Sequence, residues 1–237
     1  PDQRMDEVSR HALALLLALS RRLFLYSPSV HAGVWDVKVG APVWRMAGLT
    51  FGIVGFGRIG RAVAPKAQGF GLKVIACDPY IDPNEMIQRH VTPVDLDTLL
   101  RTSDFVTLHV PLTPQTRGMI GAEALAKMKP SAYLANTARG PVVDVAALAA
   151  ALREGRLAGA GLDVLPHEPP DFNDPLFNLP NLIVSPHAAF YSEGSLAELQ
   201  LKAAQRVAEA LQGQIPSTVV NPAVLDQPNC RLAAVRR

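Results

Sequence analysis

Short apolar runs alternate along the chain with longer segments in which apolar and polar residues recur at helical spacing. The apolar runs predict strands at 51–54, 73–77, 104–109, 132–136, 158–163 and 182–184. The longer segments predict helices at 58–68, 96–101, 122–128 and 144–154, with Gly155 placed to stop the last of them. This alternation predicts an α/β fold, a doubly wound parallel sheet with helices on both faces.

Helical patterns also flank the alternating region. The first is predicted to be capped by Asp6 or Ser9 and to run to about Arg22, and the second covers 192–211. Residues 27–48 carry polar and turn residues around the two tryptophans, and they predict a loop with a short helix.

The turn after the first predicted strand reads Gly-x-Gly-x-x-Gly, and an acid ends the second strand. Gly55 permits a sharp turn, Gly57 leaves room for a pyrophosphate, and Gly60 lets the next helix pack against the strand. That helix points unpaired N–H groups and the positive end of its dipole at the diphosphate. Asp78 follows Gly60 at close to the spacing of roughly 20 residues at which an acid binds the ribose hydroxyls. A carboxylate there repels a 2′-phosphate, so the sequence predicts NAD rather than NADP.

Composition narrows the remaining possibilities. The 237 residues are 49% hydrophobic, enough for a substantial core, and a net charge of +2 gives no support for nucleic acid or an anionic membrane as a partner. The apolar run 12–19 is too short to span a bilayer, and no cleavage site of a signal peptide follows it. Cys77 and Cys230 define neither a disulfide framework nor a metal site, which fits a reducing cytoplasm.

Three side chains that can bind a carboxylate or move a proton follow predicted strands. Arg139 follows 132–136, Glu168 lies in the proline-rich loop 166–180, and His187 follows the last strand. Arg offers a fork for a carboxylate or ketone oxygen, His can take a hydroxyl proton, and a Glu beside it orients the ring and favours its protonated form. Taken singly, each residue has a more common interpretation: Arg139 as a surface charge, Glu168 as a solvated acid, and His187 as a surface or capping residue. Their spacing alone does not join them.

Four motifs do join them. Gly55–Gly60, Asn136–Gly140, Asp163–Pro169 and Ser185–Ala189 resemble the D-isomer-specific 2-hydroxyacid dehydrogenases, in the family's order and over nearly the whole chain. The resemblance implies an NAD-binding Rossmann domain of an oxidoreductase. Such an enzyme transfers a hydride between NAD(H) and the CH–OH or C=O carbon of a D-2-hydroxy acid or 2-keto acid.

The resemblance also assigns roles to residues. His187 is the general acid/base, Glu168 is its partner, and Arg139 holds the substrate carboxylate and carbonyl. Asp163 takes the nicotinamide carboxamide. The residues that the resemblance places around the cofactor are Gly55, Gly57, Arg58, Ile59, Gly60 and Asp78 at the pyrophosphate and ribose, His109, Val110, Pro111 and Thr116 at the adenosine pocket, and Thr137, Ala138, Arg139, Asp163 and His187 at the nicotinamide.

Within the family the chain looks closest to the C-terminal-binding-protein branch, and phosphoglycerate dehydrogenases share most of the same motifs. That branch usually carries Trp where this chain has Phe190, which leaves the substrate open. Two alternatives to an enzyme stay open at this point. One is a corepressor-like protein that senses NAD(H), and the other is an inactive homologue that only dimerises.

The resemblance finally implies a domain organisation. Residues 1–22 form an interdomain or dimer helix, 23–190 the NAD-binding domain, and 191–237 a helix and tail that return to a flavodoxin-like substrate domain. Because that substrate domain is absent from this sequence, we expect the chain to bind NAD but to turn over poorly. A homodimer is expected, with contacts through Ala12–Leu19 and the segment around Trp44.

Overall fold

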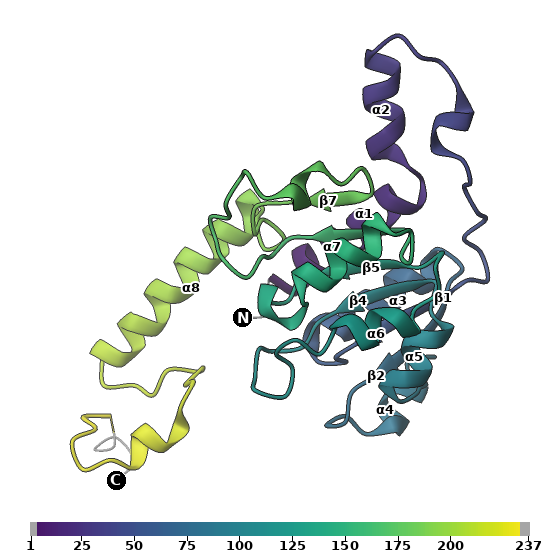
Figure 1. Cartoon of the computed structure of the whole chain (residues 1–237). Helices are drawn as coiled ribbons and strands as arrows, with labels where there is room; N and C mark the ends of the chain where they lie inside the picture. The colour runs from purple at the N-terminus through teal and green to yellow at the C-terminus, as the bar shows by residue number, and fades with distance from the viewer. Residues whose placement is uncertain (1–3, 233–237) are drawn as a thin grey trace. The chain divides into compact units, whose positions relative to one another are not determined.

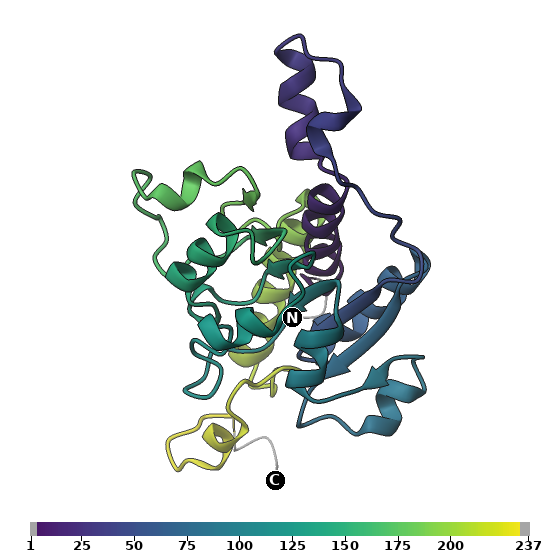
Figure 2. The same cartoon turned by 45° about the vertical axis from the view of Figure 1, so that its right-hand side comes forward.

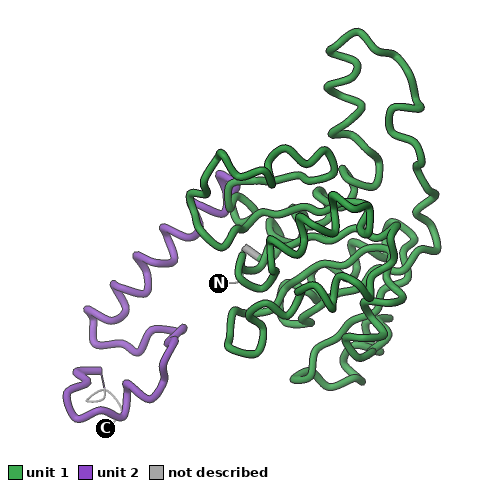
Figure 3. The backbone as a smooth tube through the Cα atoms, viewed as in Figure 1, with its two compact units in different colours: residues 1–190 green, residues 191–237 purple. Residues whose placement is uncertain are grey.

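The chain divides into two compact units, residues 1–190 and residues 191–237 (Figure 3). The structure is a computed structural model, and it describes residues 4–232. The first unit contains the sheet and the motifs that suggest chemistry. The second contains one long helix and a tail.

Within residues 4–232, seven strands form one sheet in which every pairing is parallel (Figure 1). Their order is β3-β2-β1-β4-β5-β6-β7. The strands are β1 (Thr50–Val54), β2 (Lys73–Cys77), β3 (Thr92–Pro93), β4 (Phe105–Leu108), β5 (Tyr133–Asn136), β6 (Gly159–Leu162) and β7 (Leu182–Val184). The order runs outward from β1 in both directions, so the strand order reverses between β1 and β4, where ligands of such sheets bind. The predicted doubly wound α/β fold is confirmed, and only the two-residue β3 was missed.

Helices cover both faces of the sheet, as the alternation predicted (Figures 1 and 2). The helices of the first unit are α1 (Arg4–Ser20), α2 (Leu23–His31), α3 (Arg58–Gly69), α4 (Pro83–Ile87), α5 (Leu96–Thr102), α6 (Ala122–Lys127) and α7 (Val145–Arg153), with short 3-10 turns η1 (Val37–Gly40), η2 (Gly140–Val142) and η3 (Pro175–Asn178). The structure adds α4, a five-residue helix that was too short to show periodicity in the sequence.

Two apolar cores lie on opposite faces of the sheet because neighbouring strand residues point to opposite sides. One core takes Val106 of β4 together with leucines of α5, α6 and α7. The other takes Phe105 of the same strand together with side chains of α1 and α3. The two cores hold the strands rigidly, so the ends of the strands are fixed platforms for the loops that follow them.

Helix α1 corrects two predictions. It begins at Arg4, so Asp6 and Ser9 lie inside the helix and do not cap it. The Asp6 carboxylate instead pairs with Lys66 of α3 at 3.0 Å, and the Ser9 hydroxyl donates to the Asp6 carbonyl at 2.9 Å. Of the segment predicted to form the dimer contact, Ala12–Leu19, the side chains of Leu13, Leu16 and Leu19 pack in the core, so these three are not available for such a contact.

Residues 23–47 form an arm that projects from the rest of the first unit (Figures 1 and 2). The sequence predicted a loop with a short helix over 27–48, and the structure has α2 from Leu23 to His31, which begins before that range, followed by the short turn η1. Helix α2 contains Pro28 and has no buried residue, and its apolar side chains do not gather on one face, so it lacks the apolar stripe by which helices are predicted. The arm exposes Trp35, at 89%, and Trp44, at 63%.

The second unit confirms the predicted C-terminal helix. Helix α8 (Glu193–Leu211) is capped by Ser192, whose hydroxyl accepts from the Ser195 N–H while the Ser195 hydroxyl accepts from the Ser192 N–H. After α8, Gly213 takes a positive φ of 76°, and a turn η4 (Pro222–Asp226) follows. Among the described helices, none alone is long and apolar enough to cross a membrane, and α1 with α2 pass that test only as a pair bent by 61°.

Candidate active site

The residues singled out in the sequence gather at one edge of the sheet. Because all the pairings are parallel, the carboxyl ends of the strands share this edge. The glycine-rich turn follows β1, Asp78 follows β2, His109 follows β4 and Thr137 follows β5. Asp163 follows β6, and His187 comes shortly after β7. The fold therefore brings together side chains that lie more than a hundred residues apart in the sequence.

The glycine-rich turn has the geometry that its sequence predicted. Gly55 has a φ of 92°, and a Cβ atom on Gly60 would overlap the Gly55 carbonyl. Helix α3 begins at Arg58, and its N-cap residue Gly57 has no side chain to satisfy the first N–H groups. A helix start of this kind attracts an anion such as a diphosphate. A Cβ on Gly57 would project into open space, which is the space that a ligand needs.

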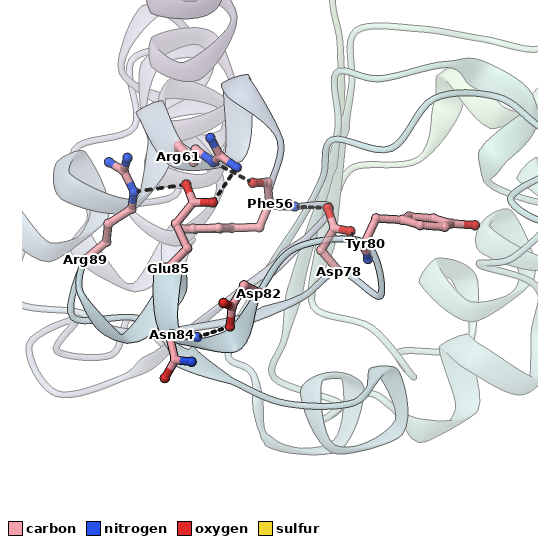
Figure 4. A network of polar contacts seen from close by, with 8 residues as sticks. All are labelled: Phe56, Arg61, Asp78, Tyr80, Asp82, Asn84, Glu85 and Arg89. Carbon is pink, nitrogen blue, oxygen red and sulfur yellow. Dashed lines mark hydrogen bonds and ion pairs between the residues drawn. The ribbon is translucent and has the colours of Figure 1, made fainter.

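The peptide of Phe56, in the middle of this turn, is held from both sides (Figure 4). Its N–H donates to Asp78 Oδ2 at 2.8 Å, and its carbonyl accepts from Arg61 Nε at 3.2 Å. Arg61 is held in turn by Glu85 of α4, at 2.9 Å. The other Asp78 oxygen accepts from the Tyr80 N–H at 2.9 Å, so this carboxylate has a fixed orientation at the end of β2.

His109 and Thr137 leave buried polar atoms without partners. His109 Nε2 lies 3.0 Å from the Thr107 hydroxyl, and burial lowers the pKa of His109 to about 3, so the ring is neutral. Among the described residues, His109 Nδ1 and Thr137 Oγ1 have no hydrogen-bond partner. Buried polar atoms of this kind are costly, and a polar ligand at this edge would satisfy them. With the glycine-rich turn and Asp78, they make a site whose chemistry fits NAD.

The loop after His109 is closed by Thr116. Its hydroxyl donates to the Pro111 carbonyl at 2.6 Å and accepts from the Thr113 N–H at 2.8 Å. Val110 packs beside Gly55, because a Cβ on Gly55 would lie 3.0 Å from a Val110 methyl group. The segment predicted to line the adenosine pocket thus lies next to the glycine-rich turn.

Arg139 follows β5 on a backbone that is tied down locally. The Asn136 side chain accepts from the Ala138 N–H and donates to the Arg139 carbonyl, both at 3.0 Å. The Arg139 side chain is exposed, and its Nη1 donates to the Ala138 carbonyl at 2.6 Å. Its remaining N–H groups can form the fork that binds a carboxylate.

Glu168 and His187 form a pair, as the resemblance predicted. The distance from His187 Nδ1 to Glu168 Oε2 is 2.7 Å, and the other Glu168 oxygen accepts from the Leu165 N–H at 2.9 Å. Burial by itself raises the pKa of Glu168, but the hydrogen bonds from His187 and Leu165 and the nearby charge of Arg139 outweigh it. The pKa of Glu168 therefore lies below its ordinary value, and the carboxylate is ionised beside the ring.

His187 has the left-handed φ of 54°, and its ring packs edge-on against the ring of Phe190, with centroids 6.2 Å apart. A cavity of about 510 Å³ adjoins the pair and is lined largely by apolar residues such as Pro169, Phe172 and Phe177, as well as by Asp163. A mostly apolar hollow with a few polar groups suits a small organic ligand. Two other hollows, of about 670 and 630 Å³, lie around residues near the amino ends of strands, such as Lys73 and Ala158.

The Asp163 carboxylate accepts several hydrogen bonds and is 1% exposed. Its Oδ1 accepts from the Ser185 hydroxyl at 2.6 Å and from the Ala188 N–H at 2.8 Å, and its Oδ2 accepts from the Ala189 N–H at 2.9 Å. The Asp163 carbonyl accepts from the His187 N–H at 2.8 Å. Asp163 thus fixes the segment that carries His187, and Oδ2 keeps acceptor capacity for a ligand.

Sequence reasoning missed several residues of this network. Ser185 begins the motif Ser185–Ala189, which suggested no role for it, and no motif includes His11, Arg61 or Glu85. His11 is 174 residues from Ser185 in the sequence, and Glu85 belongs to a helix that was not predicted. No local pattern could have found these partners, because the fold alone brings them to the site.

Comparison with known proteins gives this geometry a family. Residues 13–189 match the family described as D-isomer specific 2-hydroxyacid dehydrogenase, NAD binding domain. The chain belongs to this family. Among the described residues, no group of three or more His, Cys, Asp or Glu side chains is placed to hold a metal ion.

Individual relatives are dehydrogenases and reductases. The chain is 43% identical over 222 residues to a glycerate dehydrogenase of Methylorubrum extorquens, covering 91% of this chain and 68% of that protein. It is 42% identical over 236 residues to a glyoxylate reductase of Thermococcus litoralis, covering 95% and 70%. A crystal structure of D-lactate dehydrogenase with NAD+ from Lactobacillus jensenii superimposes with a TM-score of 0.84, at 30% identity, covering 93% of this chain and 70% of that one.

These relatives settle the choice between the main hypotheses. The chain is the NAD-binding part of an NAD-dependent oxidoreductase that acts on hydroxy or keto acids. They favour this function over the corepressor-like sensor that the sequence had left open.

Proposed function

We propose that the site transfers a hydride between NAD(H) and the CH–OH or C=O carbon of a D-2-hydroxy or 2-keto acid, with His187 as the general acid/base. The observation that carries this proposal is the 2.7 Å contact between His187 Nδ1 and Glu168 Oε2, at the strand edge that also presents Arg139 and Asp163. NAD(H) when bound supplies the hydride donor or acceptor.

The chain's own groups would hold that cofactor along the edge of the sheet. The start of α3, with Arg58 and Ile59, faces the diphosphate, and Asp78 accepts from the ribose hydroxyls. Val110 and Pro111 border the adenosine, while Thr137 and Ala138 border the nicotinamide. Asp163 Oδ2 accepts from the carboxamide.

His187 moves the proton of the substrate hydroxyl. Because the Glu168 carboxylate accepts from Nδ1–H, the neutral ring presents Nε2 as an acceptor. Nε2 therefore takes the hydroxyl proton when the alcohol is oxidised and returns it to the carbonyl oxygen when the ketone is reduced. Arg139 holds the substrate carboxylate through its fork of N–H donors, which keeps the reacting carbon beside the imidazole.

Replacing His187 by Asn and Glu168 by Gln tests this assignment. The assays are NADH oxidation with glyoxylate and NAD reduction with glycerate or D-lactate, chosen after the names of the relatives. We expect His187→Asn to lower kcat by about 10²–10⁴-fold and Glu168→Gln to lower it by about tenfold or more. The matched control is His167→Asn, which alters an exposed histidine of the same loop as Glu168 and should leave kcat unchanged. Undiminished turnover by His187→Asn would refute the proposed role.

Asp78 supports a preference for NADH over NADPH. Its two oxygens are already aligned by the N–H groups of Phe56 and Tyr80, so the carboxylate cannot swing away from a 2′-phosphate without breaking those bonds. We expect Asp78→Ser to weaken NADH binding and to narrow the ratio between the two affinities. An equal loss of affinity for both cofactors would speak against this role.

A homodimer formed through the arm is the second part of the proposal. The arm presents Trp35, Val37 and Trp44 at 89%, 80% and 63% exposure, and exposed apolar clusters of this kind mark interaction sites. Because Leu13, Leu16 and Leu19 of α1 pack in the core, they are unavailable for a subunit contact, and the arm is the better candidate. Sedimentation of Trp35→Ser and Val37→Ser should show more monomer than the parent chain, whereas an unchanged dimer would exclude the arm.

The location of the protein and the place of its C-terminal unit also stay proposals. A cytoplasmic location is supported by Cys77 and Cys230, which are both unpaired thiols. Residues 191–237 are proposed to return to a substrate domain, as the family resemblance implies.

A further inference from the structure

A histidine on α1 reaches the active-site edge from the far end of the sequence. His11 Nε2 lies 2.8 Å from the Ser185 hydroxyl oxygen and 3.4 Å from Asp163 Oδ1. Ser185 in turn lies 2.6 Å from the same Asp163 oxygen. These three side chains form a line that starts on a helix, passes the end of β7 and finishes at the carboxylate after β6.

The direction of each hydrogen bond in this line follows from counting protons. A serine hydroxyl has one proton, and the ionised Asp163 oxygen can only accept. The Ser185 hydroxyl donates its proton to the Asp163 oxygen at 2.6 Å, since hydrogen bonds to a carboxylate are the short and strong ones. The Ser185 oxygen must therefore accept at the other contact, so His11 Nε2 carries a proton and donates it.

Asp163 passes this constraint on to the catalytic segment. Its two oxygens accept from the N–H groups of Ala188 and Ala189, the residues that directly follow His187. Rotation of the Asp163 carboxylate about its Cβ–Cγ bond would misalign both of these hydrogen bonds and also the lone pair of Oδ2. The line from His11 thus bears on the atom that the proposed function assigns to the nicotinamide carboxamide.

Packing gives no reason for a histidine at this position. The core of α1 is made by Leu13, Leu16 and Leu19, whereas the side chain of His11 keeps 28% of its surface exposed. An aliphatic residue exposed to the same degree would cover the same area. What the histidine adds is the N–H donor directed at Ser185.

We infer that His11 is a positioning residue, which locks the Ser185 hydroxyl and through it holds the Asp163 carboxylate in the orientation that receives the nicotinamide. The inference rests on the proposed function, because it takes the role of Asp163 from there. His11 itself touches neither substrate nor cofactor in this scheme.

The test compares NADH with ADP-ribose, which lacks the nicotinamide. Both affinities are measured by calorimetry on the 237-residue chain, for the parent, His11→Leu and His11→Gln. Loss of one hydrogen bond in the line should weaken NADH binding about fivefold, while ADP-ribose affinity stays within experimental error. His11→Gln should restore NADH affinity, because its amide N–H₂ can reach the place of Nε2–H.

Two further variants separate the possible failures. Ser185→Ala removes the middle of the line with a smaller change of volume and should reproduce the effect of His11→Leu, which keeps the test valid if His11→Leu does not fold. Asp163→Asn tests the proposed function itself: it should lower the NADH affinity relative to ADP-ribose. If Asp163→Asn does so and neither His11→Leu nor Ser185→Ala does, the inference fails while the proposed function stands.

Other outcomes are equally decisive. Equal loss of NADH and ADP-ribose affinity in His11→Leu would show a merely structural role. Failure of His11→Gln to restore binding would show that the donor is not what matters. If Asp163→Asn leaves the affinity ratio unchanged, the proposed role of Asp163 fails and the inference falls with it.

Discussion

The backbone of Leu165 occupies the space that a Cβ atom on Gly140 would need. This contact joins the loop after β5, which carries Arg139, to the loop after β6, which carries Glu168. No side chain fits between the two loops, so the charged residues that flank the contact are held close together. Gly140, which has no side chain, thus sets how closely Arg139 and Glu168 approach each other.

We therefore expect Gly140→Ala to damage the site more than the addition of one methyl group suggests. The methyl group would overlap the Leu165 carbonyl and the Pro166 nitrogen, so the two loops must separate. Overpacking of this kind costs about 1–3 kcal/mol of stability, and turnover should fall by a larger factor than NADH affinity. Gly69→Ala is the matched control, since a Cβ there meets nothing within 4 Å. Equal behaviour of the two variants in urea unfolding and in turnover would contradict the argument.

Glu85→Gln should loosen the glycine-rich turn from a distance. The substitution weakens the hold on Arg61, whose side chain is bonded to the Phe56 carbonyl (Figure 4). Both members of the ion pair are about one third exposed, so the expected effect is modest, about 1 kcal/mol or less. NADH and ADP-ribose should lose affinity together, by about two- to fivefold, because both carry the diphosphate.

The control for this prediction is Asp97→Asn. Asp97 forms a comparable surface pair with Arg101 on α5 at 2.7 Å, and it lies outside the network around the turn. Its substitution should leave both affinities unchanged. Unaltered binding by Glu85→Gln, or an equal loss in the control, would show that α4 has no part in shaping the turn.

His109 should make the stability of the fold depend on pH. Its pKa of about 3 in the folded chain lies below the ordinary 6.5, so between these values the unfolded chain binds the proton and the folded chain does not. His109 therefore leaves the free energy of unfolding unchanged above pH 6.5. Below that value His109 lowers the free energy of unfolding as the pH drops toward 3, with a slope of up to about 1.4 kcal/mol per pH unit. His109→Gln should flatten this slope in urea unfolding measured from pH 7 to pH 4.

The exposed His167 serves as the comparison, because His167→Gln alters a histidine without changing the core. It should leave the slope as in the parent chain. Parallel curves for His109→Gln and the parent would mean that the buried ring does not account for the acid sensitivity.

Leu16→Ala should test whether α1 is a core helix. Leu16 is 1% exposed, and truncation of a buried leucine costs about 2–5 kcal/mol. We expect unfolding at lower urea concentration with the oligomeric state of the folded protein unchanged. Dissociation without loss of stability would instead place Leu16 in a subunit contact, against the packing seen here.

The sequence predicted the sheet well, and it pointed to residues that the fold places along one edge of that sheet, because both leave local signals. Six strands appear as apolar runs, and the turn from Gly55 to Gly60 needs glycines at fixed positions for steric reasons. His187 and Glu168 could be paired only through the family resemblance, because nothing in the spacing of residues 168 and 187 shows that the two side chains meet. Their contact depends on where β6 and β7 end.

The failures have equally physical causes. The bounds of α2 were missed because its apolar side chains do not gather on one face, so the helix has no apolar stripe. The leucines of α1 were assigned to a dimer contact because an apolar stripe has the same sequence pattern whether a sheet or a second subunit covers it. Ser185 and His11 were missed because hydrogen-bonded lines across 174 residues leave no periodic signal.

Both tryptophans of the chain, Trp35 and Trp44, lie in the arm, and Trp44 borders hollows around Asp104 and Tyr133, near the amino ends of β4 and β5. The cofactor edge is at the opposite ends of these strands. Intrinsic emission at tryptophan wavelengths therefore reports on solvent exposure of the arm, while the emission of NADH reports on the nucleotide site. The two emissions can be recorded in one sample, so association of subunits can be followed separately from occupancy of the nucleotide site.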